Sequence, residues 1–360
     1  MTLQPASAPP DPAPPAPDPG GVASWRDYLK LARPTQWAKG AFVVVGPLYG
    51  GAWHTPAHML AIGGAVLAMS LASSGCYVMN DIRDREVDAQ HPRKRLRPIA
   101  SGRIGVAQAR IFAVALWLGA AGGVALAALG PGGLTSAGLL GVIAALYIAN
   151  VTAYSEGMKR IAILDVISLA LGFVLRVLAG CAVVLIEPSS WLLNVVFFLA
   201  MFLAFGKRLG ERRTMGPRAA AARAVQSAYT DDLLRMAVVV TAVATLLTYA
   251  AYTQSQDDRF RYMIGPAGAG PDAASGAGFA MNLLWLTVLP ATYGLLRCIV
   301  LLERGRYDDP TVLVTRDRPT QAAVALFGLL TAGLLWTHPA PRAEAPGREH
   351  DGDSRIVDPG

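Results

Sequence analysis

Nine long apolar segments, separated by charged stretches, restrict the possible folds of this chain more than any other feature. An α-helix rises 1.5 Å per residue, so about 20 apolar residues cross the roughly 30 Å hydrocarbon core of a bilayer. No segment shows the sustained alternation of apolar and polar residues that a membrane β-barrel needs. Only 16% of the 360 residues are charged, whereas soluble domains carry about 25%. The sequence therefore predicts an all-α, polytopic membrane protein, with spans at about 38–54, 58–80, 107–129, 134–153, 162–186, 190–206, 233–254, 279–302 and 320–337.

The basic residues are concentrated in alternate loops. The stretches after the second, fourth, sixth and eighth segments are rich in Lys and Arg, whereas the loops near 130–134 and 187–190 contain neither. Positively charged loops tend to stay on the cytoplasmic side of a membrane. We therefore expect a multi-pass protein of the inner (cell) membrane, with a cytoplasmic N-terminus and an external C-terminus. This topology accounts for the net charge of +7, so a nucleic-acid partner is disfavoured.

Two tails flank the apolar region. Residues 1–24 are dominated by Pro and Ala and contain no Lys or Arg, and residues 339–360 are polar. The first tail cannot bury apolar surface, so we expect it to be a disordered, flexible segment on the cytoplasmic side. Residues 25–338 then form one membrane domain, because no domain boundary or fixed-period repeat is visible. The sequence leaves open whether the chain forms a homo-oligomer.

The most informative polar stretch follows the second segment and reads Asn80-Asp-Ile-Arg-Asp-Arg-Glu-Val-Asp88. If the helix continues through it, Asp81, Asp84 and Asp88 lie at positions i, i+3 and i+7 on one face. Three carboxylates on one face repel each other and favour a divalent cation, and Mg²⁺ is commonly bound by carboxylates together with phosphate oxygens. Acidic groups beside a membrane span are costly and indicate function. The alternative without a binding site is a solvated loop whose acidic side chains pair with neighbouring arginines.

A basic run follows the acidic stretch between His91 and Gly102. It contains Arg93, Lys94, Arg95 and Arg97. Closely spaced basic side chains can hold a phosphate group. The alternative is that these charges only fix the topology of the loop.

The aspartate pattern N-D-x-x-D-x-x-x-D resembles the first aspartate motif of the UbiA-type intramembrane prenyltransferase superfamily. That resemblance implies a bundle of nine transmembrane helices with a Mg²⁺–diphosphate site in a cavity that faces the cytoplasm. Further segments make the chain similar to the decaprenyl-phosphate phosphoribosyltransferase branch, over about residues 26–337. These segments are 33–39, 77–102, 206–211, 227–230 and 316–318.

One departure from the superfamily pattern supports this branch. Enzymes that use a prenyl diphosphate usually carry a second motif, D-x-x-x-D, on the fifth helix. Here Asp165 is followed four residues later by Leu169, and Arg176 lies on the same side of the helix at i+11. A lost carboxylate and an added cation suit a donor that carries a further phosphate beside its diphosphate, as phosphoribosyl diphosphate does.

The resemblance implies transfer of 5-phosphoribose from phosphoribosyl diphosphate to a polyprenyl phosphate, with release of diphosphate. Asp81, Asp84 and Asp88 would hold Mg²⁺ against the leaving diphosphate, and Asp165 would complete the metal shell or contact the ribose hydroxyls. Tyr154 resembles part of a Tyr/Lys element of the superfamily. The residues expected to bind substrate are Lys39, Asn80, Lys94, Arg95, Tyr154, Lys159, Arg176, Lys207 and Arg208.

Two alternatives remain open on the sequence. An aromatic prenyltransferase with a prenyl diphosphate donor would keep the metal site, and the missing second aspartate motif counts against it. A transporter with an acidic cation site would more often place its charges in mid-span on broken helices. Here the charges gather near one side of the membrane, apart from Asp165 and Arg176.

Overall fold

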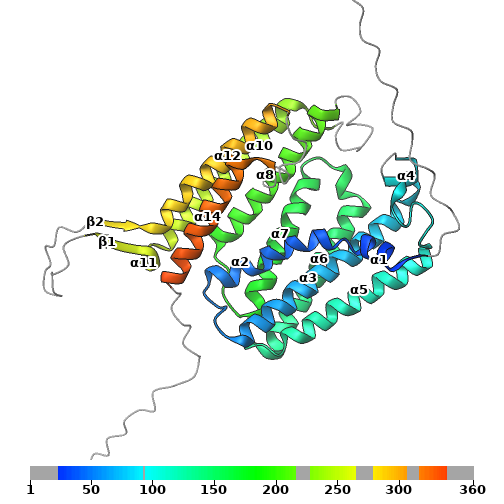
Figure 1. The fold of residues 1–360 in the computed structure, drawn as a ribbon, viewed down its shortest axis with the longest axis horizontal. Helices are drawn as coiled ribbons and strands as arrows, with labels where there is room; N and C mark the ends of the chain where they lie inside the picture. Colours follow the sequence, from blue (N-terminus) through cyan, green and yellow to red (C-terminus); the bar gives the residue numbers. More distant parts are fainter. Residues whose placement is uncertain (1–22, 92–93, 216–227, 265–278, 306–315, 339–360) are drawn as a thin grey trace, which may run out of the picture.

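The computed structural model of the chain describes residues 23–91, 94–215, 228–264, 279–305 and 316–338. The described part is an α-helical bundle, which confirms the predicted fold class (Figure 1). Eight of its helical segments are long and apolar enough to cross a membrane. They are α3 (Pro56–Arg83), α5 (Val106–Ala127), α6 (Gly133–Glu156), α7 (Leu164–Val183), α8 (Ser190–Met215), α10 (Asp231–Ser255), η5 with α12 (Leu283–Glu303) and α14 (Arg318–Thr337).

The first predicted span has a different form from the other eight. It consists of a 3₁₀ segment, η1 (Pro34–Gly40), followed by the short helix α2 (Ala41–Tyr49), which contains Pro47. A 3₁₀-helix rises about 2.0 Å per residue and an α-helix 1.5 Å. The two elements together therefore extend over about 27 Å, close to the thickness of a bilayer core.

Short elements complete the described chain. A two-stranded antiparallel sheet pairs β1 with β2 at the end of α10, so the eighth predicted span begins as a strand and becomes helical only from Leu283. The remaining elements are α1 (Trp25–Ala32), α4 (Arg85–Gln90), η2 (Lys94–Leu96), η3 (Met158–Arg160), α11 (Asp257–Phe260), β1 (Arg261–Ile264), β2 (Phe279–Asn282), η5 (Leu283–Thr287) and α12 (Val288–Glu303). Both predicted tails fall almost wholly outside the described residues.

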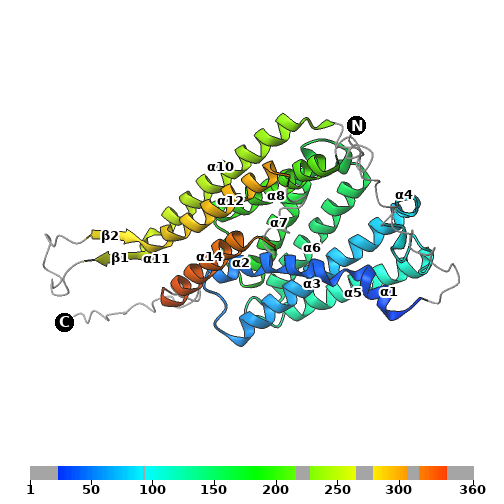
Figure 2. The ribbon, with the colours of Figure 1, turned by 45° about the horizontal axis from the view of Figure 1, so that its top comes forward.

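Helix α7 joins two groups of helices. On one side it packs against α2, α3 and α6, and on the other against α8, which in turn packs on α10 (Figure 2). Helices α3 and α5 lie so close together at Gly123 that a Cβ there would be 2.7 Å from the Ala68 nitrogen and 2.8 Å from the Gly64 oxygen. Small residues allow such close contact between membrane helices. The bundle thus places α7, with Asp165 and Arg176, between its two groups of helices.

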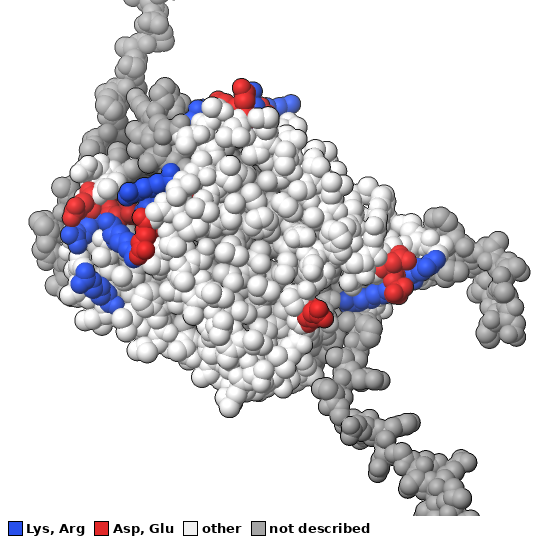
Figure 3. Space-filling model, turned by 180° about the vertical axis from the view of Figure 1, so that it is seen from behind, with Lys and Arg blue, Asp and Glu red and all other residues white. Residues whose placement is uncertain are grey.

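The charges of the molecule lie mainly at its ends. In Figure 3 a broad uncharged face separates charged groups at the left and at the top of the view from a smaller charged group at the right. Many large apolar side chains of the molecule are exposed, for example Ile111, Leu247 and Leu329. An uncharged, apolar belt of this kind is the surface that a lipid bilayer covers.

Candidate active site

The three predicted metal-binding carboxylates lie where α3 passes into α4. Helix α3 ends at Arg83 and α4 begins at Arg85, so the expected continuous helix is interrupted at Asp84, whose φ and ψ are −86° and 2°. The backbone N–H of Asp88 still donates to the carbonyl oxygen of Asp84, at 2.8 Å. The interruption is therefore slight. We call Asp81, Asp84 and Asp88 the acidic row.

Two members of the acidic row share one arginine. The Nη1 atom of Arg97 lies 3.0 Å from Oδ1 of Asp81 and 2.6 Å from Oδ2 of Asp88. Asp81 also accepts a hydrogen bond from Arg33 at 2.6 Å, and Nζ of Lys94 lies 3.8 Å from Oδ1 of Asp88. The side chains of Asp81 and Asp88 are 4% and 3% exposed. Cations thus compensate the two buried carboxylates, as burial of charge requires.

The third member, Asp84, is more accessible to solvent. Its side chain is 32% exposed and binds Nζ of Lys159 at 3.0 Å. The amide of Asn80 donates to the same carboxylate, at 3.0 Å. The structure therefore brings Asn80, Lys94 and Lys159 together with the acidic row at one end of the bundle, which we call the charged end.

The donor chemistry of the acidic row fits Mg²⁺, because this cation prefers carboxylate oxygens. Within the described ranges, no three His, Cys, Asp or Glu side chains are close enough together to hold a metal ion. The guanidinium of Arg97 lies between Asp81 and Asp88 instead. A metal ion bound by both carboxylates would replace Arg97 as the positive charge that compensates Asp81 and Asp88.

Asp165 occupies a separate, fully buried cluster between α7 and α8. Its Oδ2 atom accepts hydrogen bonds from Nε and Nη2 of Arg208, at 3.2 and 3.1 Å. Its Oδ1 atom accepts one from the hydroxyl of Tyr229, at 2.6 Å, and this hydroxyl in turn accepts the backbone N–H of Ile163. Burial and the hydrogen bond to Asp165 raise the pKa of Tyr229, so its hydroxyl stays protonated. Asp165 and Arg208 therefore meet each other rather than the acidic row.

Arg176 lies buried in the interior of the bundle, in contact with α3 and α6. Its guanidinium donates to the hydroxyl of Tyr147 at 2.7 Å, to Ser73 at 3.4 Å and to the carbonyl of Gly172 at 3.0 Å. Within the part of the chain that the structure describes, these hydrogen-bond partners are all neutral. Ser73 precedes Asp81 by eight residues, which places Arg176 about 12 Å deeper along α3 than the acidic row.

Lys39 lies near this buried arginine. Its Nζ atom is 5.9 Å from the ring centre of Phe173, and Cζ of Arg176 is 5.7 Å from the same ring. Two cations beside one aromatic ring make this part of the bundle interior positively charged, which favours a negatively charged ligand. The sequence places Asp165 and Arg176 on one side of the fifth span. In the structure Asp165 contacts Arg208 and Tyr229, whereas Arg176 contacts Ser73 and Tyr147.

Three of the predicted residues are less informative. Lys207 and Tyr154 are half-buried on α8 and α6. Arg95 is half-buried in η2, and its buried Nε atom has no hydrogen-bond partner among the described residues. Burial alone assigns none of these three side chains a role.

Several residues that the structure brings to these clusters lie outside the predicted set. Arg33 and Arg97 belong to the segments 33–39 and 77–102, which the sequence singles out without indicating their contacts. Tyr147 has no distinguishing neighbours in the sequence, and Tyr229 belongs to the segment 227–230, which the sequence singles out without indicating its contacts. Their hydrogen bonds to Arg176 and Asp165 join residues 29 and 64 positions apart, and such pairs depend on packing between helices.

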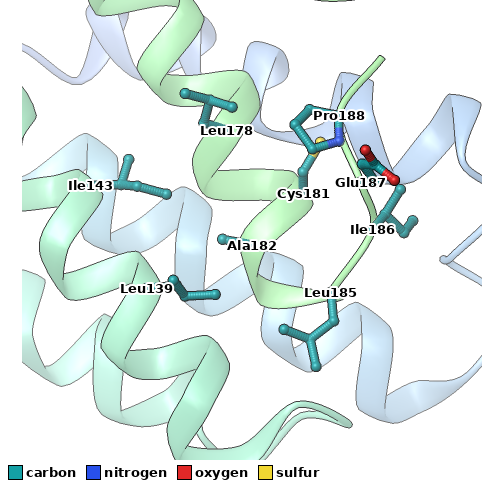
Figure 4. Close-up of a pocket in the computed structure, with 9 residues that line it drawn as sticks. All are labelled: Leu139, Ile143, Leu178, Cys181, Ala182, Leu185, Ile186, Glu187 and Pro188. Carbon is teal, nitrogen blue, oxygen red and sulfur yellow. The ribbon is translucent and has the colours of Figure 1, made fainter. Parts of the chain in front are cut away.

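An apolar cavity of about 350 Å³ lies between α6 and the end of α7 (Figure 4). Cys181 follows Asp165 by 16 residues, so the cavity is about 24 Å along α7 from Asp165. Its lining consists of Leu139, Ile143, Leu178, Cys181, Ala182, Leu185, Ile186, Glu187 and Pro188. The cavity therefore lies at the opposite end of α7 from this carboxylate.

Comparison with known proteins agrees with the sequence motifs. The profile of the UbiA prenyltransferase family matches residues 41–312. A protein of Mycobacterium tuberculosis named decaprenyl-phosphate phosphoribosyltransferase is 30% identical over 309 residues, which are 85% of this chain and 92% of that protein. A protein of the same name from Mycolicibacterium smegmatis is 31% identical over 316 residues, which are 86% and 92% of the two chains.

Solved structures agree on the fold. A UbiA homologue from Archaeoglobus fulgidus, solved with GPP and Mg²⁺, superposes with a TM-score of 0.59 at 16% identity and covers 86% of this chain and 99% of its own. At this identity the likeness shows the fold alone. Together with the family profile and the mycobacterial relatives, it identifies the chain as a membrane-bound transferase that belongs to the UbiA prenyltransferase family.

Proposed function

We propose that this protein transfers 5-phosphoribose from phosphoribosyl diphosphate to a polyprenyl phosphate of the decaprenyl type. The mycobacterial relatives, by their names, support this substrate pair. The observation that carries the proposal is the polar composition of α7. Its single acid, Asp165, is fully engaged by Arg208 and Tyr229, whereas Arg176 is a buried cation with neutral described partners. Helix α7 thus favours a phosphate group, here that of the acceptor lipid, over a second metal-bound diphosphate.

The reaction breaks the bond between C1 of the ribose and the diphosphate oxygen, and forms a bond between C1 and an oxygen of the lipid phosphate. The departing diphosphate takes the bonding electron pair, so negative charge develops on it while C1 becomes oxocarbenium-like. Mg²⁺, held by the acidic row when bound, would neutralise part of that charge. Lys94 and Lys159, which contact the row, would stabilise the same charge through hydrogen bonds.

The acceptor lipid supplies its own nucleophile, because its phosphate oxygen is already anionic. No strong general base is therefore needed. Arg176 and Lys39, deeper in the bundle, would attract and orient this phosphate while its hydrocarbon chain remains in the bilayer. The buried Asp165–Arg208 pair would keep α7 and α8 in register beside the site.

We place the charged end on the cytoplasmic side of the inner membrane, and the C-terminus on the outside. The alternation of basic loops supports this orientation. It also suits the donor, since phosphoribosyl diphosphate is a water-soluble anion that must reach the acidic row from an aqueous compartment.

The direct test uses purified protein with polyprenyl phosphate and Mg²⁺. One reaction receives radiolabelled phosphoribosyl diphosphate, and a second receives a labelled prenyl diphosphate with 4-hydroxybenzoate. We expect label in the lipid phase from phosphoribosyl diphosphate alone. Asp84→Ala should lower this transfer by about 100-fold or more, whereas Glu86→Ala is the matched control, because Glu86 is 80% exposed and contacts Arg85.

Transfer of label only in the second reaction would make the protein an aromatic prenyltransferase and would refute the proposal. Equal losses in Asp84→Ala and Glu86→Ala would mean that the acidic row has no special part in the reaction. Omission of Mg²⁺ with excess chelator tests the metal requirement in the same assay, and full activity without divalent ions would exclude it.

A further inference from the structure

A basic pocket of about 340 Å³ lies beside the acidic row, between α1 and the stretch from η2 to Pro98. Its size falls within the range of small-molecule sites. None of its basic side chains has a role in the reaction as proposed above. The pocket is lined by Lys30, Arg33, Asp81, Leu96, Arg97 and Pro98.

The charged end has more cations than its carboxylates need. The pocket and the contacts of the row bring together five cationic side chains against the three carboxylates of the row. The cations are Lys30, Arg33, Lys94, Arg97 and Lys159. Asp27, an acid on the same helix as Lys30, is already engaged by Ser24 and Arg103. The surplus positive charge favours an anion beyond those that the described protein supplies here.

The cations of the pocket remain accessible, whereas its acid does not. The side chains of Arg33 and Arg97 are 26% and 30% exposed, and Lys30 is exposed, but Asp81 is only 4% exposed. A guanidinium carries five N–H donors. Arg33 contacts Asp81 through Nη2 and Arg97 contacts the row through Nη1, so each retains donors for a ligand. Such groups bind phosphate with charge-assisted hydrogen bonds.

We infer that this pocket binds a phosphate monoester, the 5-phosphate of the phosphoribosyl donor. The inference rests on the proposed function and names a subsite for it. Asp81 belongs both to the acidic row and to the wall of the pocket, so a donor with its diphosphate at the row has its second phosphate within reach of the pocket. A prenyl diphosphate carries no phosphate apart from its diphosphate. The pocket therefore determines the choice of donor.

The test measures discrimination between two donors, phosphoribosyl diphosphate and ribose 1-diphosphate, which lacks the 5-phosphate. Lys30→Met removes a cation of the pocket and leaves in place the ion pairs of Arg33 and Arg97 with the row. We expect the KM for phosphoribosyl diphosphate to rise about tenfold with little change in kcat, and the preference for this donor over ribose 1-diphosphate to fall by a similar factor. Arg110→Met is the matched control, since Arg110 is an exposed cation on the first turns of α5 and is not part of the pocket.

If Lys30→Met impairs both donors equally, or no more than Arg110→Met does, the pocket does not recognise the 5-phosphate and the inference is wrong. The same assay in nanodiscs of phosphatidylcholine alone, and with phosphatidylglycerol added, tests a lipid headgroup as the ligand. An effect confined to the anionic nanodiscs would overturn the donor assignment. Failure of the wild-type protein to transfer phosphoribose at all would instead refute the proposed function.

Discussion

Replacing Asp165 by alanine should destabilise the protein by about 3 kcal/mol, because it leaves the guanidinium of Arg208 buried without its main counter-ion. The two side chains are 0% and 2% exposed, and their closest N–O distance is 3.1 Å. Breaking a buried ion pair typically costs about 3–5 kcal/mol. We take the lower end, because Glu211 lies 3.7 Å from Arg208 and offsets part of the uncompensated charge.

Removing both charges should cost much less than removing one. In the double variant Asp165→Leu with Arg208→Met, apolar side chains of similar volume replace the pair, and such exchanges are often close to neutral. Tyr229 loses its acceptor but still accepts the backbone N–H of Ile163, so about 1 kcal/mol of destabilisation should remain. The pattern of a large single loss and a small double loss identifies a structural ion pair.

Unfolding in detergent, followed by tryptophan fluorescence during titration with SDS, measures both variants against the wild-type protein. A wild-type midpoint for Asp165→Ala would refute the reasoning, since it would mean that the buried pair does not stabilise the fold. Phosphoribosyl transfer by the double variant answers a separate question. If the double variant folds but remains inactive, Asp165, Arg208 or both also act in the reaction, as the family resemblance implies for each of them.

Three single substitutions give further predictions. The guanidinium of Arg297 hydrogen-bonds to Asp317 and, although burial opposes it and Thr320 assists it, holds the pKa of this carboxyl well below its ordinary value of 3.8. The stabilisation that ionised Asp317 gives the fold is therefore complete above about pH 5 and is lost as the pH falls below about 4. Thermal melts of Asp317→Asn and of the wild-type protein should differ at pH 7 and converge in acid. Gly123→Ala should cost about 1–3 kcal/mol in the same SDS titration, because its Cβ would meet α3 backbone, whereas Gly122→Ala, whose Cβ meets nothing within 4 Å, should cost nothing. Arg176→Met should abolish transfer in the radiolabel assay while melting no lower than wild type, since it removes a buried charge with neutral described partners; loss of folding together with activity would contradict this.

Most of the bundle could be predicted from the sequence, because membrane spans are recognisable by their length and apolar composition. Eight predicted segments correspond to helical segments of the structure. The 3₁₀ form of the first segment could not be predicted, since Pro34 at its start is compatible with either helix type. The interruption of the helix at Asp84 could not be predicted either, because no Pro or Gly marks it.

The sequence could predict the acidic row, but neither its contacts nor the two arginines, Arg33 and Arg97, that pair with it. The spacing of Asp81, Asp84 and Asp88 indicated an acidic site, and the structure brings Lys94 and Lys159 to it. The separation of Asp165 from this row follows from its contacts with α8, which no local pattern encodes. Interactions between residues far apart in the chain depend on how helices pack, and single-sequence patterns report only what lies within one helix.

Because one nitrogen of Arg97 contacts both Asp81 and Asp88, these two carboxylates form a single thermodynamic unit. Replacing either acid leaves the guanidinium of Arg97 with one carboxylate partner instead of two, and this strengthens its interaction with the remaining carboxylate. The free-energy costs of the two substitutions in a double-mutant cycle are then not additive, and when Arg97 is also replaced the deviation falls to that of the direct repulsion between the two carboxylates. Arg97, which in the sequence is one more basic side chain of a loop, therefore couples the two ends of the acidic row.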